Sequence, residues 1–383
     1  MLSLLTATGW AANHFSAMIP VLHTERGYSD TFLAGVFGIY AIGLLPGLLA
    51  GGAVSDRLGR ARVALPGAIV AAGGTLILLT WHDPTGLLTG RFVVGLGAGA
   101  TFSAGTAWMA DIGGRHGATV AGVALTAGFG GGPVVSGLLA TGLPHSLVVP
   151  FAVSLALSAL AVAGVVASRV AVRESTPSPL VSTAAAPSPD VRTLGRSSRK
   201  ALTWAIPIGP FVFTSAAIGL ITLPGRLPGD DTGPLLAGVA AGLGLGSGML
   251  AQFVARRRGR PYGVTGLACS AAGMLLLAAA GDLVGLGVFV LGSLLLGIAY
   301  GLCLHAGLSD LDRWAPPERR GALTGMFFVA TYLGFGVPLL LEWLEPEVGG
   351  TWPLVWLAAI AGAVAVARAV RGSRPVRPSP PAL

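Results

Sequence analysis

The chain has 383 residues, of which 53% are hydrophobic and only 10% are charged, and its mean hydropathy is +0.76. A water-soluble domain of this length has about 25% charged residues, so the composition excludes one and indicates a protein of the lipid bilayer. The net charge of +8 does not indicate nucleic-acid binding, because the basic residues are spread over many short segments.

Apolar stretches follow one another along the whole chain, and each is close to the roughly 20 residues that a helix needs to cross a bilayer. Twelve membrane-spanning helices are predicted, at residues 2–22, 31–54, 63–81, 85–109, 117–140, 146–168, 201–223, 233–255, 262–281, 283–308, 321–344 and 351–370. The first stretch lacks a cleavage site of small residues after a basic start, so we expect a retained helix. The expected fold class is all-α and integral to the membrane.

A polar stripe runs along the first stretch. Thr6, Trp10, Asn13 and His14 have the spacing of one helix face, with His14 near the middle of the bilayer. Histidine is readily protonated near neutral pH, and tryptophan offers an aromatic wall to an apolar or cationic substrate. Two interpretations remain open. Trp10, Asn13 and His14 line a substrate cavity where His14 couples protons, or His14 is packed and donates to a carbonyl of a neighbouring helix.

Arg91 is the only arginine in the interior of a predicted span, since Arg368 falls at the cytoplasmic end of the last one. A charge at the bilayer centre costs at least about 2.5–3.5 kcal/mol on insertion scales, so its guanidinium is expected to face a partner, a water-filled cavity or a substrate. The alternative is that Arg91 extends its side chain to the interface.

The fifth stretch carries a run of glycines around a proline, with Gly128, Gly132, Pro133 and Gly137 as its landmarks. Proline removes a backbone donor and glycine removes side-chain bulk. The helix is therefore expected to bend here and to pack closely against a neighbour.

The longest polar segment, 169–200, is rich in Pro, Ser, Thr and Ala and cannot bury enough apolar area to fold. We predict a linker there. It separates a bundle of six helices at 1–168 from a second bundle of six at 201–370, and residues 371–383 form a tail.

The two bundles echo each other in sequence. Matching residues recur at an offset near 200, namely Gly59 and Gly259, Arg60 and Arg260, Pro20 and Pro224, and Pro133 and Pro338. A constant offset between elements of the same topological phase indicates a duplicated unit.

The positions of the basic residues predict the orientation. With the amino terminus in the cytoplasm, every lysine and arginine lies on the cytoplasmic side except Arg26 and Arg226, which fall outside, and Arg91. This distribution obeys the positive-inside rule. We expect a multi-pass protein of the plasma membrane, the inner membrane of a bacterium, with both termini in the cytoplasm.

Three segments resemble the major facilitator superfamily, and the topology and duplication extend the resemblance over the chain. Residues 52–62 are similar to its cytoplasmic signature, although Ala61 stands where a second basic residue is usual. Residues 91–99 are similar to the pattern of its fourth helix. Residues 128–137 resemble a pattern associated with its drug and proton antiporters.

The resemblance implies two pseudo-symmetric bundles that enclose a central substrate cavity and rock between two states. It also implies a conformational latch made of Gly52, Asp56, Arg57, Gly59, Arg60 and Asp111. The alternative is that Asp56 and its arginines only anchor a loop at the headgroups. By the same analogy, the glycine-rich part of the fifth stretch is expected to pack against span 8 of the other bundle.

The predicted function is secondary active transport: proton-coupled efflux of a small, largely apolar organic molecule by a monomer. No enzyme constellation is present in the sequence, and no cofactor, metal or nucleic acid is expected. Spans 1, 4, 7, 8 and 10 lack a buried carboxylate and Glu342 falls near the outer face, so the proton candidates are His14, Asp56 and Asp111.

Two other functions stay open. One is uptake or facilitated diffusion of a small organic anion or metabolite, which Arg91 and the missing buried carboxylates would suit. The other is a receptor-like protein that transports nothing, against which the Asp56 signature argues, because a protein that never alternates has little use for a latch.

Overall fold

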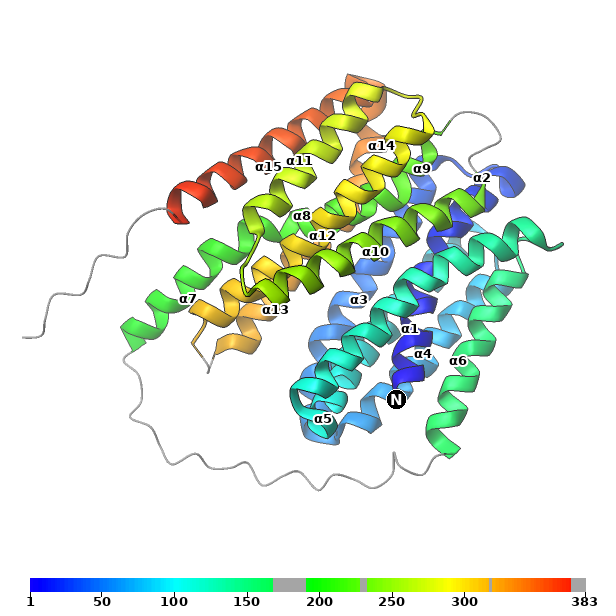
Figure 1. The fold of residues 1–383 in the computed structure, drawn as a ribbon. Coiled ribbons are helices and arrows are strands. Elements are labelled where there is room, and N and C mark those ends of the chain that lie inside the picture. Colours follow the sequence, from blue (N-terminus) through cyan, green and yellow to red (C-terminus); the bar gives the residue numbers. More distant parts are fainter. Residues whose placement is uncertain (168–190, 228–232, 317–318, 373–383) are drawn as a thin grey trace, which may run out of the picture.

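The computed structural model describes residues 1–167, 191–227, 233–316 and 319–372, and within these ranges it is helical with no strand (Figure 1). Among the described residues, 11 helices are long and apolar enough to cross a membrane. The remaining predicted span, the first, is also helical but is broken into short pieces. The prediction of an all-α integral membrane fold is therefore confirmed.

The first half of the chain forms one group of helices, blue to green in Figure 1. Its elements are α1 (Leu2–Asn13), the 3-10 helix η1 (His14–Met18), α2 (Ile19–Arg26), α3 (Asp30–Leu58), α4 (Arg60–Thr80), α5 (Pro84–Gly142) and α6 (Val149–Ala167). We call this group the N-terminal half.

The second half of the chain forms the other group, green to red in Figure 1. Its elements are α7 (Val191–Ala205), η3 (Ile206–Ile208), α8 (Gly209–Ala217), the π-helix η4 (Ile218–Thr222), α9 (Leu223–Gly225), α10 (Pro234–Arg258), α11 (Gly263–Ala280), α12 (Leu286–Trp314), α13 (Arg320–Tyr332), η7 (Leu333–Gly336), α14 (Val337–Val348) and α15 (Thr351–Gly372). We call this group the C-terminal half.

The broken spans have a sequence cause. In the first, seventh and eleventh spans, a proline occupies one of the first two positions of the piece that follows a break; these are Pro20, Pro207, Pro210, Pro224 and Pro338. Proline has no amide hydrogen and clashes with the preceding turn, but its fixed φ suits the start of a new helical piece.

α5 contains two spans, although its helical residues follow one another without a gap over 59 residues. A straight helix of that length would measure about 88 Å, far more than a bilayer. The first limb of α5 places Arg91 beside Ala12 and Gly105 beside Leu5, so its residue numbers rise as those of α1 fall. In the second limb, the residue numbers rise together with those of α1. The limbs Pro84–Gly113 and Val120–Gly142 therefore run antiparallel.

The helices of the N-terminal half approach one another through glycine. Gly95 and Gly99 of α5 lie against the backbone of α3 at Tyr40 and Leu44, while Gly97 faces the backbone of α4. In lipid, where helices gain little from hydrophobic burial, such close backbone approach is a principal source of packing energy. The glycines of the fourth predicted span thus allow α5 to pack closely against both α3 and α4.

The two halves meet along two seams. In one, the second limb of α5 packs against α10; in the other, α3 packs against α13, η7 and α14. The arginine-rich turns after α3 and α10 lie at one end of the bundle, which we call the basic end. The turns that precede α3, α5 and α12 lie at the opposite end, which we call the far end.

Residues 168–190, most of the predicted linker, lie outside the described residues. The helix of α7 begins at Val191, earlier than the predicted start of the second bundle at 201. The sequence contains a reason, because Arg192, Arg196 and Arg199 recur at helical spacing. Overall composition conceals that periodicity.

Replacing Gly95 with alanine tests the close approach of α5 to α3. The new Cβ would overlap the Tyr40 carbonyl oxygen, so we expect a loss of about 1–3 kcal/mol in stability despite the higher helix propensity of alanine. The measurement is the thermal unfolding midpoint of the purified protein in detergent. Gly73→Ala is the matched control, since a Cβ there meets nothing within 4 Å. Equal midpoints for the two variants would contradict the packing argument.

Candidate functional site

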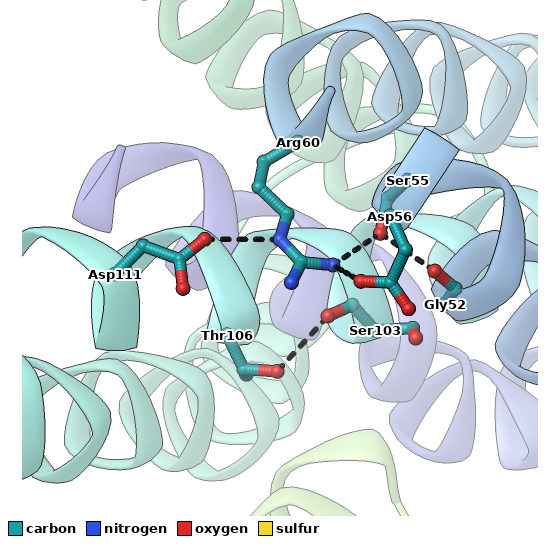
Figure 2. Close-up of polar contacts among 7 residues, drawn as sticks. All are labelled: Gly52, Ser55, Asp56, Arg60, Ser103, Thr106 and Asp111. Carbon is teal, nitrogen blue, oxygen red and sulfur yellow. Dashed lines mark hydrogen bonds and ion pairs between the residues drawn. The ribbon is translucent and has the colours of Figure 1, made fainter. Parts of the chain in front are cut away.

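A charged cluster joins three helices at the basic end (Figure 2). Gly59, with φ +98°, allows the chain to turn from α3 directly into α4, whose first residue is Arg60. The Arg60 guanidinium pairs with the Asp56 carboxylate and donates to the Ser55 hydroxyl at 2.8 Å. Its Nε donates to Asp111 at 3.0 Å. The cluster thus links α3, α4 and α5.

These ion pairs are exposed to solvent. The side chains of Asp56 and Asp111 are 64% and 54% exposed. Exposed pairs contribute about 0–1 kcal/mol each, so these contacts can be exchanged at small cost. Within the described residues, the ion pairs of this cluster all stay inside the N-terminal half.

The two other latch positions lie close by. Gly52 lies against the Ser103 side chain of α5, where a Cβ would come within 2.8 Å of the hydroxyl oxygen. Arg57 is exposed. The structure therefore gathers the predicted latch residues at one junction, and the latch role itself stays a prediction.

Arg91 is buried inside the N-terminal half. Its side chain is 1% exposed, and it donates to the carbonyl of Ala12 at 2.8 Å and to that of Phe37 at 3.5 Å. The guanidinium carbon lies 4.7 Å from the ring centre of Phe15 and 4.6 Å from that of Tyr40. Arg91 therefore connects α1, η1, α3 and α5 through carbonyl oxygens and aromatic faces.

Two residues of the polar stripe on α1, Thr6 and Asn13, face α5. Thr6 donates to the carbonyl of Ala124 at 3.0 Å, and the Asn13 amide donates to that of Phe129 at 2.8 Å. Both acceptors belong to the second limb of α5. These two members of the stripe serve helix packing within one half.

His14 is fully buried at the start of η1. Its Nδ1 lies 3.1 Å from the Trp10 carbonyl and 3.2 Å from that of Ala11, so Nδ1 carries a hydrogen and donates to these oxygens. Phe151 of α6 meets the ring edge-on with 5.2 Å between centroids. The Nε2 of His14 and the Nε1 of Trp10 are buried without a partner among the described residues.

The glycine-rich run of α5 divides between two neighbours. Gly128 and Gly132 pack against the backbone of α1 at Trp10, whereas Pro133 and Gly137 pack against α10. The expectation that Gly128 and Gly132 face span 8 is therefore wrong, and holds only for Pro133 and Gly137. Residues four apart share a helix face, so the single-residue step from Gly132 to Pro133 turns the contact to another neighbour.

A cavity of about 350 Å³ lies between the two halves at the far end. Segments of both halves line it, including α2, η4, α10 and α14. Its charged walls are Asp30, Arg226, Asp282, Glu342 and Glu345. We call this cavity the vestibule.

No motif in the sequence predicts the vestibule, although Glu342 is expected near the outer face. A signal was available in the repeat, because the matching prolines Pro20 and Pro224 both line this cavity. Its acidic residues come from three separate segments, whose meeting no local pattern reveals.

An aromatic cluster from both halves lies next to the vestibule. Phe213 stacks on Tyr332 at 4.7 Å and contacts Phe335 at 4.5 Å, and Phe37 of α3 lies 5.4 Å from Phe335. Leu220, which lines the vestibule, packs into the same apolar cluster as Phe37 and Phe335. One wall of the vestibule therefore packs against a cluster to which both halves contribute.

Comparison with known proteins identifies relatives of this chain. The model of the Major Facilitator Superfamily matches residues 1–337. Multidrug resistance protein MdtL of Klebsiella pneumoniae is 31% identical over 93 residues, which is 24% of this chain and 24% of MdtL. MdtL of Escherichia coli is 32% identical over 93 residues with the same coverage. The chain thus aligns with about a quarter of the length of these curated relatives.

Solved structures share the fold. The POT family transporter PepTSo matches with a TM-score of 0.73 at 15% identity, over 97% of each chain. The nucleoside transporter NupG matches with a TM-score of 0.68 at 16% identity, over 98% of each chain. Identities this low support a common architecture only.

Replacing Arg91 with methionine tests its structural role. Methionine fills much of the space but cannot donate to the Ala12 and Phe37 carbonyls, so we expect a loss of about 2–3 kcal/mol in stability. Thermal unfolding in detergent measures the change. The exposed Arg258→Met is the control. Wild-type stability in Arg91→Met would show that these carbonyls do not need the guanidinium.

Proposed function

The chain belongs to the major facilitator superfamily, and on that premise we propose that it exports a small, largely apolar organic molecule in exchange for protons. As a member of the superfamily it is a multi-pass membrane transporter and not an enzyme. Efflux is supported by the similarity to MdtL, which is named as a multidrug resistance protein. The direction of transport and the coupling ion belong to the proposal.

The observation that carries the proposal is the vestibule between the halves. Its walls come from both halves, and its lining residue Leu220 packs into the apolar cluster that contains Phe37 and Phe335. A cavity of this kind changes shape when one half moves against the other, as alternating access requires. The apolar side chains among its lining residues, such as Ile19, Leu220 and Leu341, suit a largely apolar substrate.

The Asp56 cluster supplies a device that responds to such movement. Leu49 of α3 lies against Gly325 of α13, so the start of α13 at Arg320 belongs to the same end of the bundle as Asp56. The N-terminus of a helix attracts negative charge. We propose that Asp56 pairs with Arg60 in one state and approaches the start of α13 in the other, as the halves rock.

The proposed orientation follows from charge. We assign the basic end to the cytoplasm, which also puts both chain termini there and the vestibule on the outer side. In an exporter, the vestibule is then on the release path. We propose that the protein carries out the transport cycle as a monomer.

The alternative of anion uptake was based on Arg91 as a binding group and on the absence of buried carboxylates in the spans. Arg91 is buried, engaged by carbonyls and rings, and not among the residues that line the vestibule, which weakens the first of these two reasons. A receptor-like protein that transports nothing is distinguished by the transport measurement itself. Efflux is therefore the function that we retain.

Asp56→Asn tests the latch. The change removes the charge and keeps the shape, so we expect transport in proteoliposomes under an imposed pH gradient to fall about tenfold or more with normal insertion. A panel of apolar organic compounds is screened first to find a substrate. Asp83→Asn, in a far-end turn, is the control and should transport normally. Full activity of a correctly inserted Asp56→Asn protein would exclude the latch.

His14→Gln tests proton coupling. The buried Nε2 of His14 has no partner among the described residues and could accept a proton, which glutamine cannot do at neutral pH. We expect gradient-driven accumulation to fall more than substrate exchange without a gradient. The exposed His145→Asn serves as control. If His14→Gln keeps full coupling, the proton site lies elsewhere.

A further inference from the structure

We propose that the turn between α10 and α11 binds an anionic phospholipid, with its phosphate at Arg257 and Arg258 and an acyl chain along the apolar face of α10. The lipid is a bound partner and not the transported molecule. The inference therefore goes beyond the proposed function and does not depend on it. It also does not depend on which side of the membrane the basic end faces.

The first observation is a concentration of positive charge without a carboxylate. Four arginines lie at the end of α10 and are exposed, namely Arg256, Arg257, Arg258 and Arg260. Within the part of the chain that the structure describes, none of them forms an ion pair. Asp310 of the adjacent α12 already pairs with Arg368. The positive charge of this turn is therefore not offset by its described neighbours.

The corresponding turn of the N-terminal half is built differently. At the offset of 200 that relates the two halves, Asp56 matches Arg256. Asp56 gives Arg60 a carboxylate from within the protein. The turn after α10 has a cation at the matching position, so charge balance there is left to an anion from outside the chain.

Side chains, and not backbone amides, are available to hold that anion. Gly259, with φ +61°, ends α10, and its amide donates to the Arg256 carbonyl at 3.2 Å. The Arg260 amide donates to the Ala255 carbonyl at 3.4 Å. The guanidinium groups are the donors that remain, and a guanidinium suits phosphate because its paired N–H groups match two phosphate oxygens.

The second observation is an apolar face that continues from the arginines along α10. Leu250, Phe253 and Val254 are 63%, 49% and 39% exposed, and helical spacing places them on the same face as Arg257. On the opposite side, Gly248 packs against the backbone of α12. An exposed apolar face on a membrane-spanning helix is a surface for acyl chains.

Arg257 joins the charge to the apolar face. Its guanidinium carbon lies 4.3 Å from the ring centre of Phe253, so the side chain folds back along the helix instead of extending into water. Arg256, by contrast, lies within electrostatic range of His305 on α12. A soluble anion makes no use of the apolar face, whereas a phospholipid can place its phosphate at Arg257 and its acyl chain along that face.

The test is lipid binding to the purified full chain in dodecyl maltoside, measured by native mass spectrometry. Dioleoylphosphatidylglycerol, which is anionic, is compared with dioleoylphosphatidylcholine, which has the same acyl chains and no net charge. We expect phosphatidylglycerol to bind at least about tenfold more tightly, the scale expected for two basic residues at a membrane surface. Added salt should reduce this preference, because the arginines are exposed and their charge is screened.

A second comparison separates a lipid from a free phosphate. Glycerophosphoglycerol, the same headgroup without acyl chains, should not displace bound phosphatidylglycerol, because it cannot use the apolar face. Phe253→Ala should weaken phosphatidylglycerol binding about threefold, since it removes both part of that face and the ring that holds Arg257.

Arginine variants locate the site. Arg257→Gln should weaken phosphatidylglycerol binding about fivefold, and the double variant with Arg258→Gln about twenty-five-fold, while phosphatidylcholine binding stays unchanged. Arg313→Gln is the matched control, because Arg313 is also exposed at the basic end and lies 4.7 Å from the ring centre of Trp314. It removes the same charge from another place. Size-exclusion profiles and unfolding midpoints check that each variant is folded.

The proposal is overturned if the two lipids bind equally well, if Arg313→Gln weakens phosphatidylglycerol binding as much as Arg257→Gln does, or if glycerophosphoglycerol displaces the lipid. Equal effects of the two variants would mean a general attraction to the basic end. Displacement by the headgroup would mean a site for soluble phosphates. A loss confined to the α10 variants, with phosphatidylcholine binding unchanged, supports the assigned site.

Discussion

The structure depends on one constraint: lipid offers no hydrogen bonds, so a polar group within the bilayer is costly unless it finds a partner in the protein. Arg91 shows how the constraint is met. Its guanidinium is buried and uses carbonyl oxygens of Ala12 and Phe37 together with aromatic faces. The Asn13 amide and the Thr6 hydroxyl follow the same rule and use α5 carbonyls. These contacts fix α1 against α3 and α5 and make the N-terminal half a single packed body.

The same constraint explains where the helices become irregular. The 3-10 helix η1, the π-helix η4 and the 3-10 helix η7 belong to the first, seventh and eleventh spans, and each lies where the two halves meet. Ser16 of η1 and Thr222 of η4 line the vestibule, and Phe335 of η7 contacts Phe37 across the seam. Irregular backbone is tolerated at membrane depth where protein or a cavity surrounds it, and such segments commonly mark hinges. These irregular segments are the places where the proposed rocking of the halves would need the backbone to adjust.

The two ends of the bundle differ in charge and in the strength of their contacts. At the basic end, Arg60 joins Asp56 and Asp111 in exposed ion pairs that can exchange. The C-terminal half carries a different arrangement there, since Asp310 pairs with Arg368 at 2.5 Å with both side chains nearly buried. At the far end, the vestibule holds a surplus of carboxylates. An exchangeable contact at one end and a charged cavity at the other suit a protein whose halves rock about the middle.

The sequence by itself determined the membrane class, the number and order of the spans, the superfamily and the residues of the Asp56 junction. Length, hydropathy and short-range motifs carry that information. A span needs only about 20 apolar residues, and the junction residues other than Asp111 all lie within residues 52–60. Only the tertiary structure decided which side chains face which helix. A step of one residue moves a side chain about 100° around a helix, which is why Gly132 faces α1 and Pro133 faces α10. The vestibule likewise required the packing of α3 against α14, because Asp30 and Glu342 are distant in sequence and meet only across the seam.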